Sequence, residues 1–164
     1  QGTVFTIFFP FYRGGTAKLQ RRIPQGEPPQ GNETVLLVED ETEILEITRT
    51  MLESQGYTVL ATSSPAEALT IAKESSERIR LLMTDVVMPE MNGRDLSKEI
   101  LSLVPDIKVL FSSGYPADVI AHHGVLDEEV NFIQKPFSLQ ELTRKVRETL
   151  GTGSFLQPPS SPLP

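Results

Sequence analysis

Carboxylates, a hydroxyl and a lysine follow short apolar runs at four places along the chain. Glu39 and Asp40 come directly after TVLLV, and Asp85 follows LLMT. Ser113 and Lys135 follow two later apolar runs. A short apolar run that ends in turn residues is typical of a buried strand whose carboxyl end opens onto a loop. These five residues are therefore the candidates for chemistry.

Three carboxylates brought to one edge need a cation. Like charges about 4 Å apart repel by about 1 kcal/mol in water and by about 4 kcal/mol near a protein surface. The set offers only oxygen ligands and the sequence has no cysteine, so Mg²⁺ is favoured over a calcium cage, because few carboxylates leave room for water ligands. Mg²⁺ beside Asp85, Lys135 and a hydroxyl suits phosphoryl transfer. Asp85 would be the nucleophile, and Lys135 and the metal would neutralise the phosphoryl oxygens.

Alternating strands and helices must position these residues. Apolar runs predict strands over residues 34–38, 57–60, 79–84, 107–111 and 131–134. Helices are expected after Asp40, over about 65–75 behind a capping box at Ser64 and Glu67, from Gly93 to Pro105, over about 116–124, and up to Leu150 behind a second capping box at Ser138 and Glu141. This order predicts an α/β fold, a doubly wound five-stranded parallel sheet with five helices. Right-handed crossovers bring all the strands' carboxyl ends to one rim, so the five candidates converge there.

Apolar spacing also predicts the helix faces that are buried. In the helix after Asp40, the expected core face comprises Ile44, Leu45, Ile47, Met51 and Leu52. In the helix after Gly93, it comprises Leu96, Ile100, Leu101 and Val104.

The length, composition and net charge of the chain argue against several classes of function. A chain of 164 residues with 38% hydrophobic residues is the size of one domain with extensions. A net charge of -7 argues against a nucleic-acid binder and against direct contact with an anionic membrane. The lack of cysteine fits a reducing compartment, and a cytoplasmic location is expected. His122 and His123 are interpreted as surface residues.

Four segments in order resemble the receiver domain of two-component response regulators: VLLVEDE, TDVVMPEMNG, SSGY and QKPF. The resemblance covers residues 33–150 and implies a flavodoxin-like strand order of 2-1-3-4-5. It also implies that Asp85 accepts a phosphoryl group from a phosphohistidine on a histidine kinase or a histidine phosphotransfer protein. Mg²⁺ would bind Asp40, Asp85 and the backbone carbonyl of Val87, with Glu39 acting through water.

The same resemblance implies a switch. Ser113 matches the hydroxyl that turns toward a new phosphoryl group, Phe132 matches the aromatic residue that then rotates inward, and Lys135 matches the family lysine. The bond before Pro136 is expected to be cis. The sequence departs from the family pattern in two places, because Glu39 replaces the more usual aspartate and Phe132 lacks the hydroxyl of a tyrosine, which leaves its switching to packing.

The ends of the chain suggest a longer parent protein. Residues 1–12, with GTVFTIFFP, resemble the last strand of a sensor histidine kinase's ATP-binding domain, and residues 13–32 have linker composition. We therefore expect the carboxyl-terminal receiver (33–150) of a hybrid histidine kinase, followed by a disordered tail (151–164). The fragment would be mainly a phosphoacceptor that assists its own phosphorylation and dephosphorylation, while the parent would be the kinase.

The expected output is a relay, feedback on the kinase, or docking through the fourth helix, fifth strand and fifth helix. The residues after Leu150 are too few for a folded DNA-binding effector. The apolar strand expected over residues 3–9 could pair with a second chain, so a dimer is an open alternative.

Two other functions stay open. A pseudo-receiver would serve only for protein docking, and a flavodoxin-like fold can hold a cofactor. Each of these residues also has an interpretation that involves no chemistry. Glu39 and Asp40 would favour a helix N-terminus, Ser113 would cap a helix, and Lys135 would be a solvated surface lysine.

Overall fold

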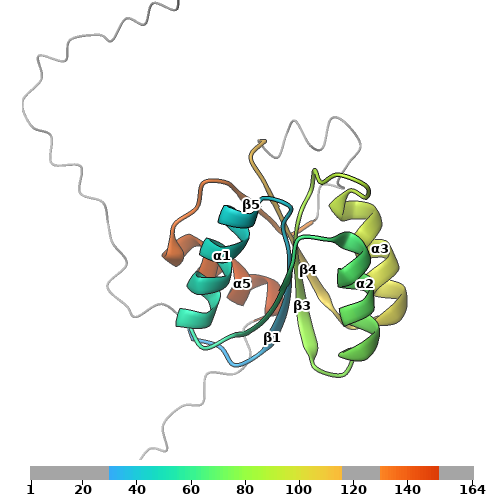
Figure 1. Ribbon diagram of the computed structural model, residues 1–164. Coiled ribbons are helices and arrows are strands. Elements are labelled where there is room, and N and C mark those ends of the chain that lie inside the picture. Colours follow the sequence, from blue (N-terminus) through green and yellow to red (C-terminus); the bar gives the residue numbers. More distant parts are fainter. Residues whose placement is uncertain (1–29, 116–129, 152–164) are drawn as a thin grey trace, which may run out of the picture.

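The core of the protein is a parallel sheet with strand order β2-β1-β3-β4-β5 (Figure 1). The computed structural model describes residues 30–115 and 130–151. The strands are β1 (Thr34–Val38), β2 (Thr58–Thr62), β3 (Ile79–Asp85), β4 (Lys108–Ser113) and β5 (Phe132–Gln134). The described helices are α1 (Thr42–Ser54), α2 (Pro65–Glu74), α3 (Gly93–Leu103) and α5 (Leu139–Leu150). The predicted doubly wound sheet and its strand order are confirmed.

Several predicted segments lie outside the described residues. They are the apolar strand within residues 1–12, most of the linker, the short helix over about 116–124 with its two histidines, and the tail beyond residue 151. Four of the five predicted helices are therefore described. None of these four is long and apolar enough to cross a membrane.

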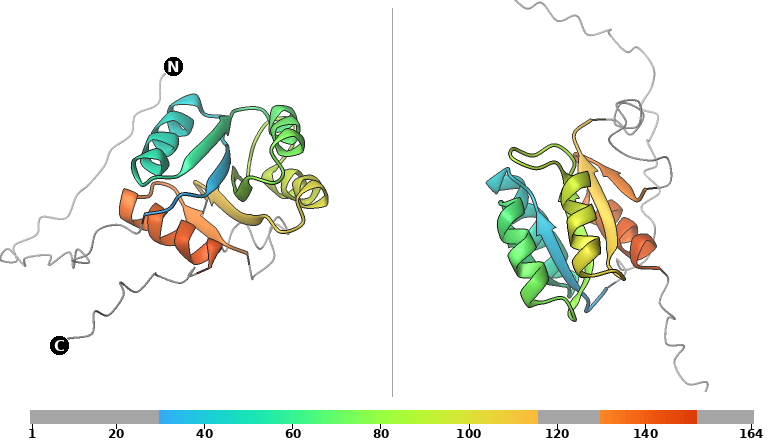
Figure 2. Two further views of the ribbon diagram at one scale, coloured as in Figure 1. Left: turned by 90° about the horizontal axis from the view of Figure 1, so that it is seen from below. Right: turned by 90° about the vertical axis from the view of Figure 1, so that its right-hand side faces the viewer.

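Both faces of the sheet are covered, which explains why its strands read as unbroken apolar runs. Val35 and Leu37 of β1 pack in a cluster with residues of α1 and α5. Leu36 and Val38 point the other way and pack in a second cluster with residues of α2 and α3. Figure 2 shows these two helix pairs on opposite faces of the sheet. Each buried side chain of this size stabilises the fold by about 1.5–3 kcal/mol.

Side-chain caps begin three of the helices. Ser138 forms the full predicted capping box, since its hydroxyl accepts from the Glu141 N–H and the Glu141 carboxylate accepts from the Ser138 N–H. At α2 only half of the predicted box forms. Ser64 accepts from the Glu67 N–H, but the Glu67 carboxylate instead accepts from the Thr62 hydroxyl at 2.5 Å. Asn92 caps α3 by accepting from the Asp95 N–H at 2.9 Å.

Two apolar residues predicted to face the core are exposed. Ile47 on α1 is 57% exposed and Leu101 on α3 is 37% exposed. Thr48 is buried in place of Ile47, because residues of an α-helix are about 100° apart and position 48 therefore shares a face with Leu45 and Leu52. The inclusion of Ile47 and Leu101 in the core faces was wrong.

At the amino-terminal ends of the strands, Arg147 of α5 contacts two residues that precede β1 and β2. Its Nη2 lies 2.6 Å from Oε2 of Glu33, and its guanidinium lies 5.2 Å from the centre of the Tyr57 ring. Burial acts to raise the pKa of Glu33, but the hydrogen bond to Arg147 and its charge outweigh burial and leave the pKa below its usual value. Arg147 thus ties residues before β1 and β2 to the last helix.

Replacing Arg147 with methionine should destabilise the fold by about 1–2 kcal/mol at pH 7, since it removes the ion pair and the cation–π contact but keeps an apolar stem. Because the folded-state pKa of Glu33 is lowered, the ion pair contributes fully above the usual glutamate pKa of about 4.3 and is lost as the pH falls below it. Urea denaturation at pH 7 and at pH 3.5 measures both effects, with a smaller difference expected at pH 3.5.

Arg144→Met is the matched control, because Arg144 pairs with Glu148 on the exposed side of α5. It should change stability by less than about 0.5 kcal/mol. If Arg147→Met lowered the free energy of unfolding no more than the control does, the contacts of Arg147 with Glu33 and Tyr57 would not stabilise the fold.

Candidate acceptor site at the carboxyl rim

Three carboxylates meet where the strand order reverses, at the carboxyl ends of the neighbouring strands β1 and β3. Glu39, Asp40 and Asp85 each present one oxygen within 4.8 Å of those of the others. Glu39 is 2% exposed and Asp85 is 7% exposed, so their charges are poorly solvated. Crevices at such reversal points are the usual ligand sites of open α/β sheets. The structure brings together the acidic residues that the sequence pattern placed at this edge.

Lys135 reaches the same cluster from the end of β5. Its Nζ lies 2.5 Å from Oε2 of Glu39 and 3.0 Å from Oδ2 of Asp85. Burial acts to lower the pKa of Lys135, but hydrogen bonds to Glu39 and Asp85 outweigh it and raise the pKa above its usual value. Burial also raises the pKa of Glu39, against the opposing effect of Lys135. The lysine therefore stays charged and bridges two of the carboxylates.

The carboxylate cluster retains free oxygens that suit a divalent cation. Within the described part of the chain, Oε1 of Glu39 and Oδ1 of Asp40 are buried without a hydrogen-bond partner. Counted by formal charge, three carboxylates and one ammonium leave two negative charges. Buried oxygens without donors are costly unless a cation meets them. An all-oxygen set with this charge fits Mg²⁺.

The loop after β3 fixes the position of Asp85. Oδ1 of Asp85 accepts from the Val86 N–H at 2.6 Å, and the same N–H also donates to the backbone carbonyl of Ser112 at 3.0 Å. Val86 in turn accepts from the Gly93 N–H at 3.0 Å, so α3 begins directly against the residue after Asp85. Val87 lies in this loop, and its side chain is 59% exposed.

Gly93 is a positioning residue that the sequence pattern did not reveal. A Cβ at this position would overlap with the backbone oxygen of Asp85 and lie 3.1 Å from Cγ2 of Thr84. The sequence analysis took Gly93 as a turn residue that ends the motif TDVVMPEMNG and leads into a helix, but it assigned this residue no role in positioning Asp85. The available signal was a glycine at the first helical position, after an asparagine cap, where better helix formers are common.

Ser113 and the start of the β5–α5 connection complete the rim. Ser113 is 1% exposed, its hydroxyl accepts from the Tyr115 N–H at 3.1 Å, and its carbonyl accepts from the Lys135 N–H at 2.8 Å. The Lys135–Pro136 bond is cis, as the family resemblance implied.

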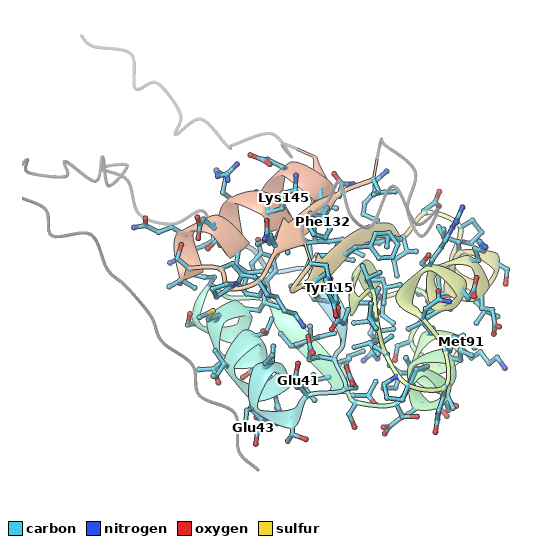
Figure 3. The ribbon with its side chains drawn as sticks, turned by 90° about the horizontal axis from the view of Figure 1, so that it is seen from above. Glu41, Glu43, Met91, Tyr115, Phe132 and Lys145 are labelled. Carbon is cyan, nitrogen blue, oxygen red and sulfur yellow. The ribbon has the colours of Figure 1, made fainter. Side chains whose placement is uncertain are left out.

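A pocket of about 450 Å³ opens over these groups. Asp85, Ser113 and Lys135 line it together with Glu41, Ile44, Val87, Gly114, Tyr115 and Pro136. Figure 3 looks onto this rim and shows Glu41 at the start of α1 and Tyr115 near the middle of the face. Glu41 and Tyr115 are the last residues of the motifs VLLVEDE and SSGY, and Ile44 was predicted to face the core, but the sequence analysis did not predict that any of the three lines a pocket.

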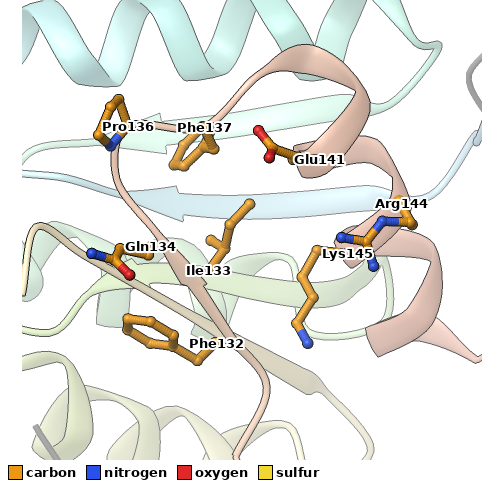
Figure 4. Close-up of a pocket in the computed structure, with 8 residues that line it drawn as sticks. All are labelled: Phe132, Ile133, Gln134, Pro136, Phe137, Glu141, Arg144 and Lys145. Atoms are coloured by element: carbon orange, nitrogen blue, oxygen red, sulfur yellow. The ribbon is translucent and has the colours of Figure 1, made fainter. Parts of the chain in front are cut away.

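Phe132 lies away from this pocket. It is partly buried and packs with Val86 and Phe111. It also lines a second pocket of about 250 Å³ between β5 and α5, with Phe137 and Lys145 among the other lining residues (Figure 4). Val86 follows Asp85 directly, so the apolar contacts of Phe132 reach the loop that carries the acceptor candidate.

Comparisons with known proteins match this chain to one family. The sequence model of the response regulator receiver domain matches residues 35–147. The sensor kinase CckA of Brucella abortus is 38% identical over 157 residues, which cover 92% of this chain and 17% of that protein. The response regulator receiver protein CpdR of the same organism is 31% identical over 71% of this chain and 95% of its own length.

Solved structures give the same result. The crystal structure of the receiver domain from the hybrid histidine kinase CckA superposes with a TM-score of 0.61 at 32% identity, covering 72% of this chain and 99% of that one. A response regulator receiver domain from Clostridium thermocellum gives a TM-score of 0.64 at 28% identity, over 72% of this chain and 94% of that one. With the site at the expected rim and the family match spanning most of the described fold, the chain belongs to the response regulator receiver domains of two-component signalling.

Proposed function

We propose that this receiver accepts a phosphoryl group on Asp85 from a phosphohistidine of a histidine kinase or a histidine phosphotransfer protein. The observation that carries this proposal is the Asp85 carboxylate, held by Lys135 and the Val86 N–H beside an open pocket. An Asp85 oxygen forms a bond to phosphorus while the phosphorus–nitrogen bond breaks. The imidazole leaves with the electron pair and takes up a proton.

The surrounding side chains supply charge and hydrogen bonds. Lys135, already 3.0 Å from Asp85, stabilises negative charge on the phosphoryl oxygens, and the Ser113 hydroxyl offers a further donor at the pocket. Asp40, Asp85 and the backbone carbonyl of Val87 would hold Mg²⁺ directly, and Glu39 would hold it through water. When bound, Mg²⁺ supplies two positive charges that offset the residual charge of the cluster and of the phosphoryl group.

The proposed response links the acceptor to a docking face. Ser113 would turn toward the phosphoryl group, and Phe132 would then move inward against Val86 and Phe111, with which it already packs. Because Phe132 has no hydroxyl, the change rests on packing alone. The pocket beside Phe132 would change shape, which gives a partner protein a surface that reports phosphorylation.

The parent protein is proposed to be a hybrid sensor histidine kinase acting at the cytoplasmic side of the cell. In this arrangement, residues 1–12 end its ATP-binding domain, residues 13–32 form a linker, residues 33–150 form the receiver and residues 151–164 form the tail. Similarity to the sensor kinase CckA covers 92% of the chain, which is more than the 35–147 receiver match. A full-length parent sequence without an upstream ATP-binding domain would overturn this arrangement.

Incubation with phosphoramidate tests the acceptor function. One phosphoryl group should appear per chain and should be lost in acid or alkali, as from an acyl phosphate, and EDTA should abolish its formation. Intact-mass spectrometry measures the label, and amide NMR shifts of Ser113 and Phe132 measure the response. A chain that binds no Mg²⁺ and takes up no phosphoryl group would instead be a docking-only receiver. Labelling that leaves the Phe132 shift unchanged would refute the switch.

A further inference from the structure

The mouth of the pocket over Asp85 differs in character from its floor. Asp85 and Ser113 are buried, whereas Val87 and Tyr115 are each 59% exposed and Glu41 is also exposed. The polar groups that would meet a phosphoryl group therefore lie deep. A phosphodonor must pass apolar side chains and Glu41 to reach them.

Glu41 leaves a negative charge at this mouth. Lys135 is the only cation among the described lining residues, and its ammonium is already shared between Glu39 and Asp85. The described residues give Glu41 no ion pair, and its side chain does not cap α1. Removing its charge should therefore leave local packing intact.

We propose that Glu41 is a specificity residue that selects against free anionic phosphodonors and thereby favours a phosphoryl group carried on a protein imidazole. The inference rests on the proposed acceptor function and adds a residue that discriminates between classes of donor. A small acyl phosphate carries two negative charges at neutral pH and is repelled at the mouth. A phosphoimidazole carries a similarly charged phosphoryl group, but the protein surface around it brings apolar contacts to Val87 and Tyr115 that a small donor lacks.

The charge of Glu41 has a calculable consequence. For charges roughly 10 Å apart in water, removing one unit should speed reaction with a dianion about fourfold and with a monoanion about twofold. Reversing the charge should roughly square these factors. Salt at about 0.5 M shortens the screening length to roughly 4 Å and should remove most of the difference.

The test compares acetyl phosphate with phosphoramidate, which is a monoanion overall, on the native chain with Mg²⁺. In each reaction, the Asp85–phosphorus bond forms as the bond to acetate or to ammonia breaks. Glu41→Gln should raise the acetyl phosphate rate constant about fourfold at low salt and the phosphoramidate rate constant about twofold. Glu41→Lys should increase both effects. Glu43→Gln, which removes a nearby exposed carboxylate of α1 that does not line the pocket, should have a smaller effect on both rates, because its charge lies farther from the donor.

The outcomes separate this inference from the acceptor function. Labelling at native rates in Glu41→Gln, with either donor, overturns the role of Glu41 and leaves the acceptor function standing. An equal gain in Glu43→Gln also overturns it, because the effect would then belong to overall charge. If neither donor labels any variant, both proposals fall.

Discussion

The Asp85→Asn variant should take up no acid-labile phosphoryl group under conditions that label the native chain. Asparagine has nearly the same shape as aspartate, but its amide is a poor nucleophile and carries no charge for Lys135 or a cation to meet. The Val86 N–H can still donate to a side-chain oxygen at this position. We therefore expect the labelling rate to fall by at least about a hundredfold, the scale of losing one essential catalytic group.

Two measurements make this prediction specific. Intact-mass spectrometry after phosphoramidate treatment should show a single unmodified species for Asp85→Asn, and circular dichroism should show the native fold. Asp106→Asn changes an exposed carboxylate in the α3–β4 connection and should label normally. If Asp85→Asn still gained one phosphoryl group, the acceptor would be another side chain of the rim, with Asp40 the first to examine.

The layered fold could be predicted because its causes are local. Residues of β1 alternate between two apolar clusters, so a run such as TVLLV has no polar face and indicates a strand covered on both sides. The capping box at Ser138 likewise involves residues only three apart. Patterns that involve only neighbouring residues can be recognised in a single sequence.

The failures have a different physical origin. Hydrophobicity placed Ile47 in the core, but helix geometry buries Thr48 instead. In the same way, the pattern could gather Glu39, Asp85 and Lys135 at one rim, but it could not show that one ammonium contacts both carboxylates. That contact joins residues 96 and 50 positions apart and depends on side-chain length and on the path of β5.

Glu41 and Tyr115 were missed for a related reason. Neither residue belongs to a repeating pattern, and each lines the pocket because of where α1 begins and where the chain leaves β4. The role of a residue at the mouth of a pocket depends on which residues the fold places around it. Such residues can be found only after the strands have been assembled.

Gly93→Ala should destabilise the protein, although helix propensity alone predicts the reverse. Alanine favours a helix interior over glycine by about 1 kcal/mol, and Gly93 is the first residue of α3. In the structure, however, the added methyl group would overlap with the backbone oxygen of Asp85. Backbone cannot rotate away as a flexible side chain can, so a net loss of about 2 kcal/mol is expected, within the range for overpacked cores.

The same substitution should also slow phosphoryl transfer, because relief of the overlap moves either α3 or the Asp85 backbone, which are joined through Val86. Urea denaturation measures the stability, and phosphoramidate labelling measures the rate. Gly114→Ala is the matched control, since Gly114 also lines the pocket but an added Cβ there meets no atom of the described residues within 4 Å. If Gly93→Ala were as stable and as fast as Gly114→Ala, close packing of α3 against Asp85 would not be what positions the acceptor.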